Sequence, residues 1–215
     1  MSDCRSFTFK DKNSGEACSV TVSNLTDQQY GSYVWPSAPL LGQFLWFNRQ
    51  KVHNKSIVEL GCGSSLPGIV ALRCGGLLKL SDGKAFSYAR KNAQDSCELN
   101  NILDIPVLSI TWGIFHPDIL NIGAVDIILG SDCFYDTKDF EDILVTVSYI
   151  LEENPSAEFW TTYQERSADR NITQLLHKWN LKCTHIPIED FYWDFNRNVP
   201  SLQMLVITKS DVLEN

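Results

Sequence analysis

The chain has 215 residues, 44% of them hydrophobic, which is enough for one domain with a sizeable core and argues against disorder. Its 26 acidic side chains outnumber its 18 basic ones, and Lys and Arg form no cluster that would grip a nucleic-acid backbone. No apolar run reaches the roughly 18 residues of a membrane span, and the N-terminus shows no signal-peptide pattern.

The seven cysteines and four histidines bear on compartment and metal binding. The number of cysteines is odd, no two of them stand at C-x-x-C spacing, and the histidines are scattered. We therefore expect free thiols, a cytoplasmic or nuclear location and no metal site.

The first part of the chain predicts a β-hairpin and then a helix. Residues 7–9 and 18–22 have strand character and flank the turn-rich segment 11–15. Between residues 37 and 49, apolar side chains recur at helical spacing.

Alternating strand and helix patterns follow. Short apolar runs at 56–60, 77–81, 106–110 and 125–130 predict strands, and the last is apolar on both faces, as in a central parallel strand. Helices are expected from residue 66 to the Gly75-Gly76 pair and, with a weaker pattern, around 85–92.

The C-terminal part predicts helices at 140–150 and 172–179, a strand at 158–163, and two closing strands near 183–186 and 204–208. Regular alternation implies a parallel sheet covered on both faces, and the closing strands, with no helix between them, imply an antiparallel pair at one edge. We therefore predict an α/β fold with a Rossmann-like, seven-stranded, mostly parallel sheet. A single domain would cover 1–215, with the hairpin extension in 1–32 and the core in 33–210.

The strongest local signal is the segment ELGCGSSLPG at residues 59–68, where the first core strand is followed by a helix. Glycine there permits a tight turn and lets a ligand approach the backbone. Leu66 stands where a dinucleotide-binding loop needs its third glycine, and the Lys of a Walker loop is absent. Taken alone, the segment fits an ordinary glycine-rich turn about as well.

Single residues at other strand ends add to this signal. Asp82 ends the second core strand, where a carboxylate could accept both ribose hydroxyls of a nucleoside or cap the next helix. Trp112 follows the third core strand, where its ring could cover an adenine, and Trp35 precedes the first core helix. Core packing is the alternative for each tryptophan.

The segment Asp132-Cys133-Phe134-Tyr135 follows the fourth core strand. If the carboxylate and the two rings line one slot, they would suit a cationic acceptor. The alternative is a turn aspartate followed by two core aromatic residues.

In their order and spacing these residues resemble the family-16 branch of the seven-β-strand methyltransferases, from about Tyr33 to Thr208. The segments that carry the resemblance are YVWP (33–36), ELGCG with LPG (59–68), SD (81–82), TWG (111–113), SDCFYD (131–136), DFEDIL (139–144) and TYQER (162–166). Two features depart from the family pattern: Ser65 replaces the common third glycine of the first loop, and residues 191–200 have no counterpart.

The resemblance implies an S-adenosyl-L-methionine-dependent methyltransferase (EC 2.1.1) that acts on a protein side chain and leaves S-adenosyl-L-homocysteine. It implies cofactor contacts at the glycine turn and at the ends of the neighbouring strands: Trp35, Glu59, Gly61, Cys62, Gly63, Asp82, Trp112, Ser131 and Asp132. The family's D-x-x-Y/F motif, which is associated with methylation of protein side chains, implies that Asp132, Phe134 and Tyr135 form the acceptor site.

The acceptor is expected to be a lysine or arginine of a basic protein such as a histone. A lysine amine must first lose a proton, whereas a guanidinium stays charged and prefers two carboxylates, such as Asp132 with Asp136 or Glu165. The D-x-x-Y motif favours lysine slightly, and the acidic balance favours a basic partner. We expect a monomer that binds neither nucleic acid nor membrane.

Other function classes remain open. A nucleic-acid or small-molecule methyltransferase is one alternative, although a basic groove is missing. A non-catalytic, cofactor-binding partner protein is another. A nicotinamide oxidoreductase is disfavoured by the missing third glycine.

Overall fold

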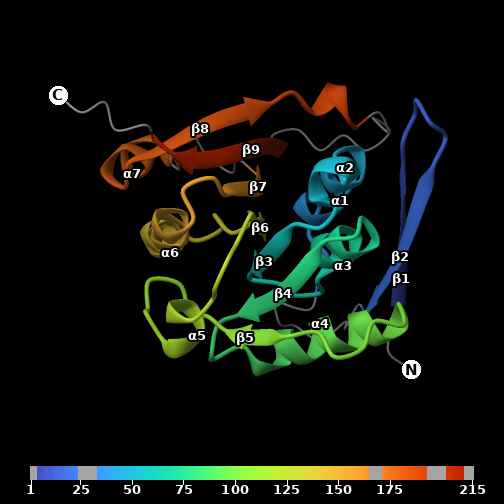
Figure 1. The fold of residues 1–215 in the computed structure, drawn as a ribbon, viewed down its shortest axis with the longest axis horizontal. Helices are drawn as coiled ribbons and strands as arrows, with labels where there is room; N and C mark the ends of the chain where they lie inside the picture. Colours follow the sequence, from blue (N-terminus) through green and yellow to red (C-terminus); the bar gives the residue numbers. More distant parts are fainter. Residues whose placement is uncertain (1–3, 24–32, 165–170, 193–201, 211–215) are drawn as a thin grey trace.

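The computed structural model of the protein describes residues 4–23, 33–164, 171–192 and 202–210. Its centre is a seven-stranded sheet in the order β5-β4-β3-β6-β7-β9-β8, and a separate two-stranded sheet, β1-β2, lies to one side (Figure 1). The strands are β1 (Cys4–Lys10), β2 (Ala17–Ser23), β3 (Ser56–Leu60), β4 (Leu77–Asp82), β5 (Val107–Ser109), β6 (Ile127–Ser131), β7 (Glu158–Gln164), β8 (Leu181–Ile186) and β9 (Leu202–Lys209).

The topology confirms the predicted Rossmann-like fold. The strands β5, β4, β3, β6 and β7 pair in parallel, and β9 pairs antiparallel with both β7 and β8. The chain adds strands outward from β3 to β5, then returns to the other side of β3 with β6. In open α/β sheets, ligands bind at the carboxyl ends of the strands beside such a reversal.

Helices cover both faces of the sheet, as expected from the alternation of strands and helices (Figure 1). On one face lie α1 (Ser37–Phe47), α2 (Arg49–Val52), α3 (Leu66–Arg73) and α4 (Ser87–Leu99). On the other lie α5 (Pro117–Leu120), α6 (Phe140–Glu153) and α7 (Thr173–Lys178). The chain also forms two short 3-10 turns, η2 (Thr137–Asp139) and η3 (Ile188–Asp190). Each face therefore has its own apolar cluster against the sheet.

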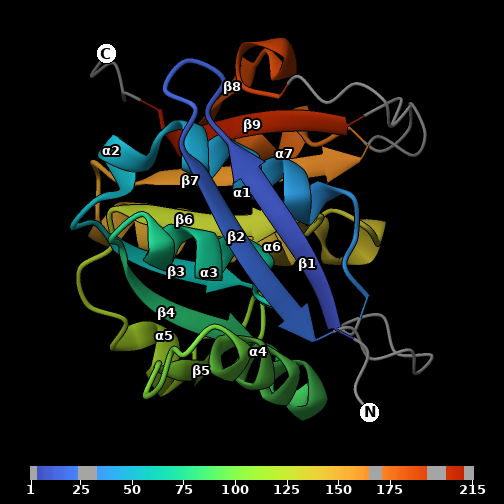
Figure 2. The ribbon, with the colours of Figure 1, turned by 90° about the vertical axis from the view of Figure 1, so that its right-hand side faces the viewer.

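The predicted hairpin is confirmed and lies outside the first helical layer, across α1, α3 and α4 (Figure 2). Its inner face is anchored by Phe9, which is 3% exposed, and a Cβ on Gly42 of α1 would lie 2.7 Å from that ring. On β2, the Thr21 N–H donates a hydrogen bond to the Asn100 side chain, which in turn donates one to the Thr21 carbonyl. The hairpin is thus packed on the core instead of projecting from it.

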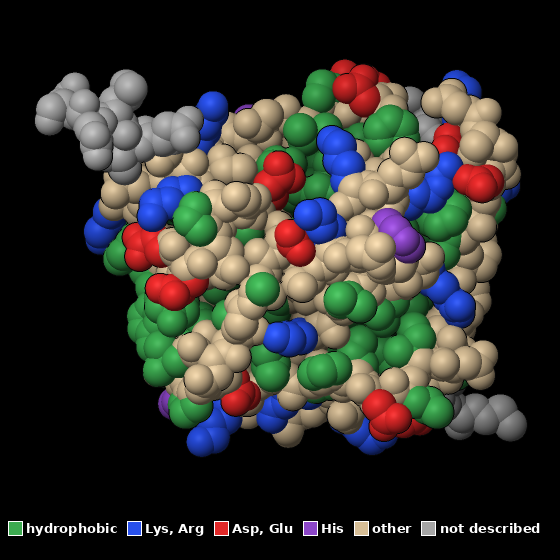
Figure 3. Space-filling model, in the orientation of Figure 1, with side chains coloured by type: hydrophobic (Ala, Val, Ile, Leu, Met, Phe, Trp, Pro, Cys, Tyr) green, Lys and Arg blue, Asp and Glu red, His purple; other side chains and the backbone are tan. Residues whose placement is uncertain are grey.

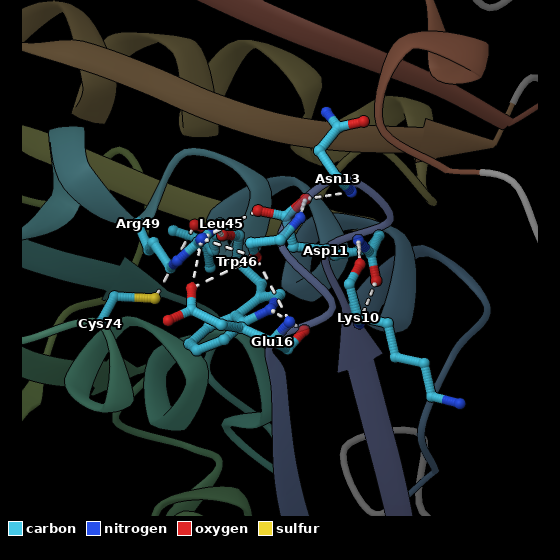
Figure 4. A network of polar contacts seen from close by, with 10 residues as sticks. Lys10, Asp11, Asn13, Glu16, Leu45, Trp46, Arg49 and Cys74 are labelled. Carbon is cyan, nitrogen blue, oxygen red and sulfur yellow. Dashed lines mark hydrogen bonds and ion pairs between the residues drawn. The ribbon is translucent and has the colours of Figure 1, made fainter.

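Arg49 fastens the tip of the hairpin (Figure 4). Its Nη2 lies 2.8 Å from Asp11 Oδ2 and 2.6 Å from Glu16 Oε2, on either side of the turn. The Asn13 N–H, together with Arg49 and Ser14, lowers the pKa of Asp11 to about 2 against the opposing effect of burial. Asp11 therefore stays ionised over the whole physiological pH range.

The structure differs from the predicted elements at a few points. The first helix ends at Phe47 instead of Arg49, because the chain turns at Asn48 before the short α2. The four-residue α5 is too short to give a periodic pattern.

On the face seen in Figure 3, acidic and basic side chains are interspersed with apolar ones. None of the helices in the described ranges is long and apolar enough to span a membrane.

Candidate functional site

A cavity of about 920 Å³ opens at the carboxyl ends of β3, β4 and β6 and beside the segment that follows β5. This volume lies within the range of small-molecule sites. The residues predicted for the site that line it are Trp35, Gly61, Cys62, Gly63, Asp82, Trp112, Ser131, Asp132 and Tyr135. The fold therefore brings together residues that are up to 100 positions apart in the sequence.

The turn after β3 has a backbone that only certain residues tolerate. Gly61 and Gly63 have φ angles of 65° and 49°, and Ser65 has 54°, so three residues lie in the left-handed region. Glycine adopts such a backbone most easily, and of these three positions only Ser65 carries a side chain there. A Cβ on Gly61 would also lie 3.0 Å from Cζ2 of Trp112.

Glu59 lies beneath this turn and does not line the cavity. It is 1% exposed; its Oε2 accepts a hydrogen bond from the Ser65 hydroxyl at 2.8 Å, and its carboxyl group also accepts one from the Gly68 N–H. Burial raises the pKa of Glu59 to about 8; the two hydrogen bonds oppose this and the charge of Asp82 adds to it. Glu59 was expected to contact the cofactor directly, but it lies behind the cavity wall and instead supports the turn from beneath.

Asp82 lies at the end of β4 on the cavity wall. Its two carboxylate oxygens accept the Gly63 N–H at 3.2 Å and the Gly83 N–H at 2.8 Å. The alternative role as a helix cap is wrong, because α4 begins only at Ser87 and its N-cap residue is Phe86. Burial raises the pKa of Asp82 to about 6, although both N–H groups and Arg90 act to lower it.

Aromatic side chains form much of the remaining cavity wall. Trp35 contacts Tyr33 edge to face, with ring centroids 5.0 Å apart, and Trp112 lies 6.4 Å from Tyr135. Both tryptophans line the cavity, and Trp112 also packs partly against the core. Trp112 therefore combines the two alternatives given for it, a place on the cavity wall and core packing. Phe86 and Tyr88, which sequence reasoning missed, line the wall next to Asp82.

Asp132 occupies a strained position directly after β6. Its φ is 55°, its N–H donates to the Thr162 carbonyl at 2.8 Å, and it is only 6% exposed. A non-glycine residue in the left-handed region is uncommon and is often found at functional sites. The strand end holds this carboxylate at the cavity wall beside Ser131.

The structure separates the two aromatic residues of the predicted acceptor motif. Tyr135 lines the cavity and is 44% exposed. Phe134 does not line it: the ring is fully buried and packs edge to face on Phe140 and Tyr163. The expectation that both rings line one slot is therefore corrected: β6 ends at Ser131, the backbone turns through the left-handed Asp132, and the Phe134 ring then joins the apolar core.

Further acidic residues line the cavity: Asp136, which was a predicted partner of Asp132, and Asp139 and Asp142, for which the sequence suggested no role. Asp136, Asp139 and Asp142 line it from η2 and the start of α6 together with Lys138, whose Nζ lies 3.0 Å from Asp136. Burial raises the pKa of Asp139, Lys138 lowers it, and the charges of Asp136 and Asp142 raise it further. The sequence signal that could have identified these aspartates is their position shortly after the end of β6. Glu165, the other predicted partner of Asp132, lies outside the described residues.

The cysteines of the cavity offer no nucleophile. Cys62 and Cys133 line it, but burial raises the pKa of each thiol well above its ordinary value, and nearby carboxylates raise it further. Reactive cysteines have lowered pKa values. In the described ranges, no three His, Cys, Asp or Glu side chains are grouped as metal ligands.

Comparison with known proteins gives a consistent result. A model of the family described as lysine methyltransferase matches residues 15–179. The histone-arginine methyltransferase METTL23 of Xenopus laevis is 47% identical over 196 residues, covering 88% of this chain and 84% of that protein. The protein of the same name from Mus musculus is 46% identical, covering 80% of this chain and 68% of its own length.

Solved structures agree with the fold. A ribosomal protein L11 methylase from Lactobacillus delbrueckii subsp. bulgaricus superposes with a TM-score of 0.58 over 81% of this chain and 79% of that one. The two sequences are only 15% identical, so this likeness concerns the fold alone.

Proposed function

This chain belongs to the lysine methyltransferase family, and on that premise we propose that it transfers the methyl group of S-adenosyl-L-methionine to an arginine side chain of a basic protein. One observation carries the proposal: a single cavity is lined by the glycine turn, Asp82 and Trp112 and also by Asp132 and Tyr135. A nucleoside-binding half and an acidic, aromatic acceptor half therefore share one space.

The cofactor half fits a sulfonium nucleoside. Asp82 is oriented by two backbone N–H groups, and its free lone pairs can accept ribose hydroxyls. The left-handed turn at Gly61 exposes bare backbone to the methionine part, and Trp112 offers a flat face for the adenine. Bound there, the cofactor would supply an electrophilic methyl group on a positively charged sulfur.

The acceptor half suits a guanidinium. Four carboxylates line the cavity besides Asp82: Asp132, Asp136, Asp139 and Asp142. A guanidinium has five N–H donors and binds best to carboxylates in a planar arrangement. The similarity to relatives named histone-arginine methyltransferases supports the same acceptor and a histone-like partner. A histone substrate in turn supports a nuclear location.

In this mechanism, the chain positions the acceptor and accepts a proton. Asp132 would hold the attacking nitrogen in line with the methyl group. Such positioning lowers the activation free energy by several kcal/mol, and by up to about 7–11 kcal/mol in favourable cases. The Asp132 carboxylate, on the cavity wall, would accept the proton that the methylated nitrogen must lose. Burial, with the charges of Asp139, Cys133 and other acidic groups, raises the pKa of Tyr135 to about 12, so its hydroxyl keeps its proton. Its ring face can contact the cation.

Tandem mass spectrometry of a reaction product tests the proposal. The protein is incubated with S-adenosyl-L-methionine and recombinant core histones, and we expect one-methyl mass gains on arginine. An acceptor peptide in which that arginine is replaced by lysine should not react. Asp132→Asn should lower kcat/KM by about 100-fold, as displacement of a positioned reactant does. Full activity of this variant would refute the acceptor site.

A lysine acceptor is the second candidate, favoured by the family description and by the motif ending in Tyr135. Reaction of the lysine peptide, with the arginine peptide inert, would select it. The acidic lining of the cavity would repel the phosphates of a nucleic acid, which disfavours a nucleic-acid acceptor.

A further inference from the structure

A buried carboxyl group lies beneath the cofactor turn without a cationic partner. Glu59 is 1% exposed, and its two donors, the Ser65 hydroxyl and the Gly68 N–H, are both neutral. Among the described residues, no Lys or Arg forms an ion pair with it. A buried carboxylate without a counter-charge is costly, so the group holds its proton when no cation is nearby.

The titratable groups around Glu59 do not change this conclusion. They are Asp82 on β4, Cys62 in the turn, Cys97 on α4 and Cys133 after β6, and each of them can only add negative charge. The helix α1 has no titratable side chain, and Arg73, the charged residue of α3, donates to the Asn100 carbonyl instead. Arg90 acts on Asp82. The environment of Glu59 therefore lacks one positive charge, which a ligand in the cavity can supply.

We propose that Glu59 senses the charge on the sulfur of the cofactor, an inference that rests on the proposed function. When the sulfonium form binds, the Glu59 carboxyl group releases its proton to solvent and becomes the counter-charge. After methyl transfer the sulfur is a neutral thioether, and the carboxylate takes one proton back. Glu59 thus discriminates the charged substrate form from the neutral product.

The geometry allows the anion to form without rearrangement. The Ser65 hydroxyl and the Gly68 N–H already donate to the carboxyl group, and both belong to the N-terminal end of α3. Hydrogen bonds to an ionised acceptor are stronger than those to a neutral one, and the start of a helix favours negative charge. Attraction to a sulfonium above the turn is enhanced because the intervening space is protein and not water.

Titration calorimetry in buffers of different ionisation enthalpy tests this, because it counts the protons released on binding. At pH 7 we expect close to one more proton released with S-adenosyl-L-methionine than with S-adenosyl-L-homocysteine. The ribose contacts of Asp82 are common to both ligands and cancel in this difference. Between pH 6 and 8, the affinity for the sulfonium form relative to the thioether should rise by up to about tenfold per pH unit.

Two variants complete the test. In Glu59→Gln, which keeps the shape of the side chain, both ligands should release equal numbers of protons and the affinity ratio should not change with pH. Ser65→Ala, which keeps the carboxyl group, should retain the difference between the ligands. Equal proton release by both ligands in the wild-type protein would overturn the inference, even if Glu59→Gln does not fold. Absence of binding heat with either ligand would instead refute the proposed function.

Discussion

At the scale of single residues, the carboxyl group of Asp82 sets a lower pH limit for cofactor binding. Its pKa of about 6 means that it is protonated below that pH and loses acceptor capacity for the ribose hydroxyls. We expect the affinity for S-adenosyl-L-homocysteine to fall by up to about tenfold per pH unit below pH 6, measured by calorimetry. Asp82→Asn should bind weakly and without this slope; an identical slope in the variant would assign it to another group.

The same two buried carboxyl groups determine how stability depends on pH. Asp82 and Glu59 have pKa values of about 6 and 8 in the folded chain, above their ordinary values of 3.8 and 4.5. Between about pH 4 and 8 the folded state therefore binds more protons than the unfolded state, so the free energy of unfolding falls as pH rises.

Denaturant titrations of the empty enzyme at several pH values measure this dependence. Glu59→Gln should flatten the decline between pH 5 and 8, and Asp82→Asn should flatten it between pH 4 and 6. A wild-type stability that rises across this whole range would contradict the assigned protonation states.

Phe134 and Tyr135 should respond in opposite ways to substitution. Phe134→Ala removes a fully buried ring and should cost about 3–5 kcal/mol of unfolding free energy. Tyr135→Ala removes a side chain that is 44% exposed, so it should cost less stability but lower kcat/KM for the protein substrate. Urea unfolding and steady-state kinetics distinguish the two, and a large kinetic effect of Phe134→Leu in fully folded protein would restore the expectation that both rings contact the acceptor.

At the scale of elements, the hairpin is predicted to stabilise the core. Phe9→Ala should cost about 3–5 kcal/mol, because the ring is 3% exposed and lies on Gly42 of α1. Thr8→Ala, on the outer face of the same strand, is the matched control and should have little effect. If the two variants unfold at the same denaturant concentration, the hairpin does not contribute to core stability.

The elements show what sequence reasoning can and cannot reach. The prediction for the strand 56–60 has the observed bounds, because this short, mostly apolar run is followed directly by a glycine turn. The short α2 and α5 were missed, since four residues give no periodicity. The weak pattern around 85–92 became the thirteen-residue α4, whose exposed face obscures the stripe.

The candidate site was predictable where the chemistry belongs to a strand end. Asp82 ends β4, Trp112 follows β5 and Asp132 follows β6, and the sheet brings them to one cavity. The roles of Ser65 and Asp142 depend on tertiary contacts: Ser65 donates to Glu59, and a Cβ on Gly113 would lie 2.6 Å from Asp142. No local pattern encodes such contacts, and the burial of Phe134 against Phe140 and Tyr163 is also a tertiary contact, made after the strand has ended.

At the scale of the whole molecule, we propose that residues 1–215 fold as one domain, because the hairpin packs on three helices of the core. The charges of the cavity are consistent with the proposed function. The cavity is lined by five aspartates and one lysine, so cationic ligands are favoured in both halves: a sulfonium near Glu59 and Asp82, and a guanidinium near Asp132.

The most direct test of the central claim is a crystal structure of the protein with S-adenosyl-L-homocysteine. We predict ribose hydroxyls within hydrogen-bond distance of Asp82, the adenine against Trp112, and the sulfur facing the space between Asp132 and Tyr135. Ligand bound elsewhere, or a cavity closed by side chains under saturating ligand, would contradict the account.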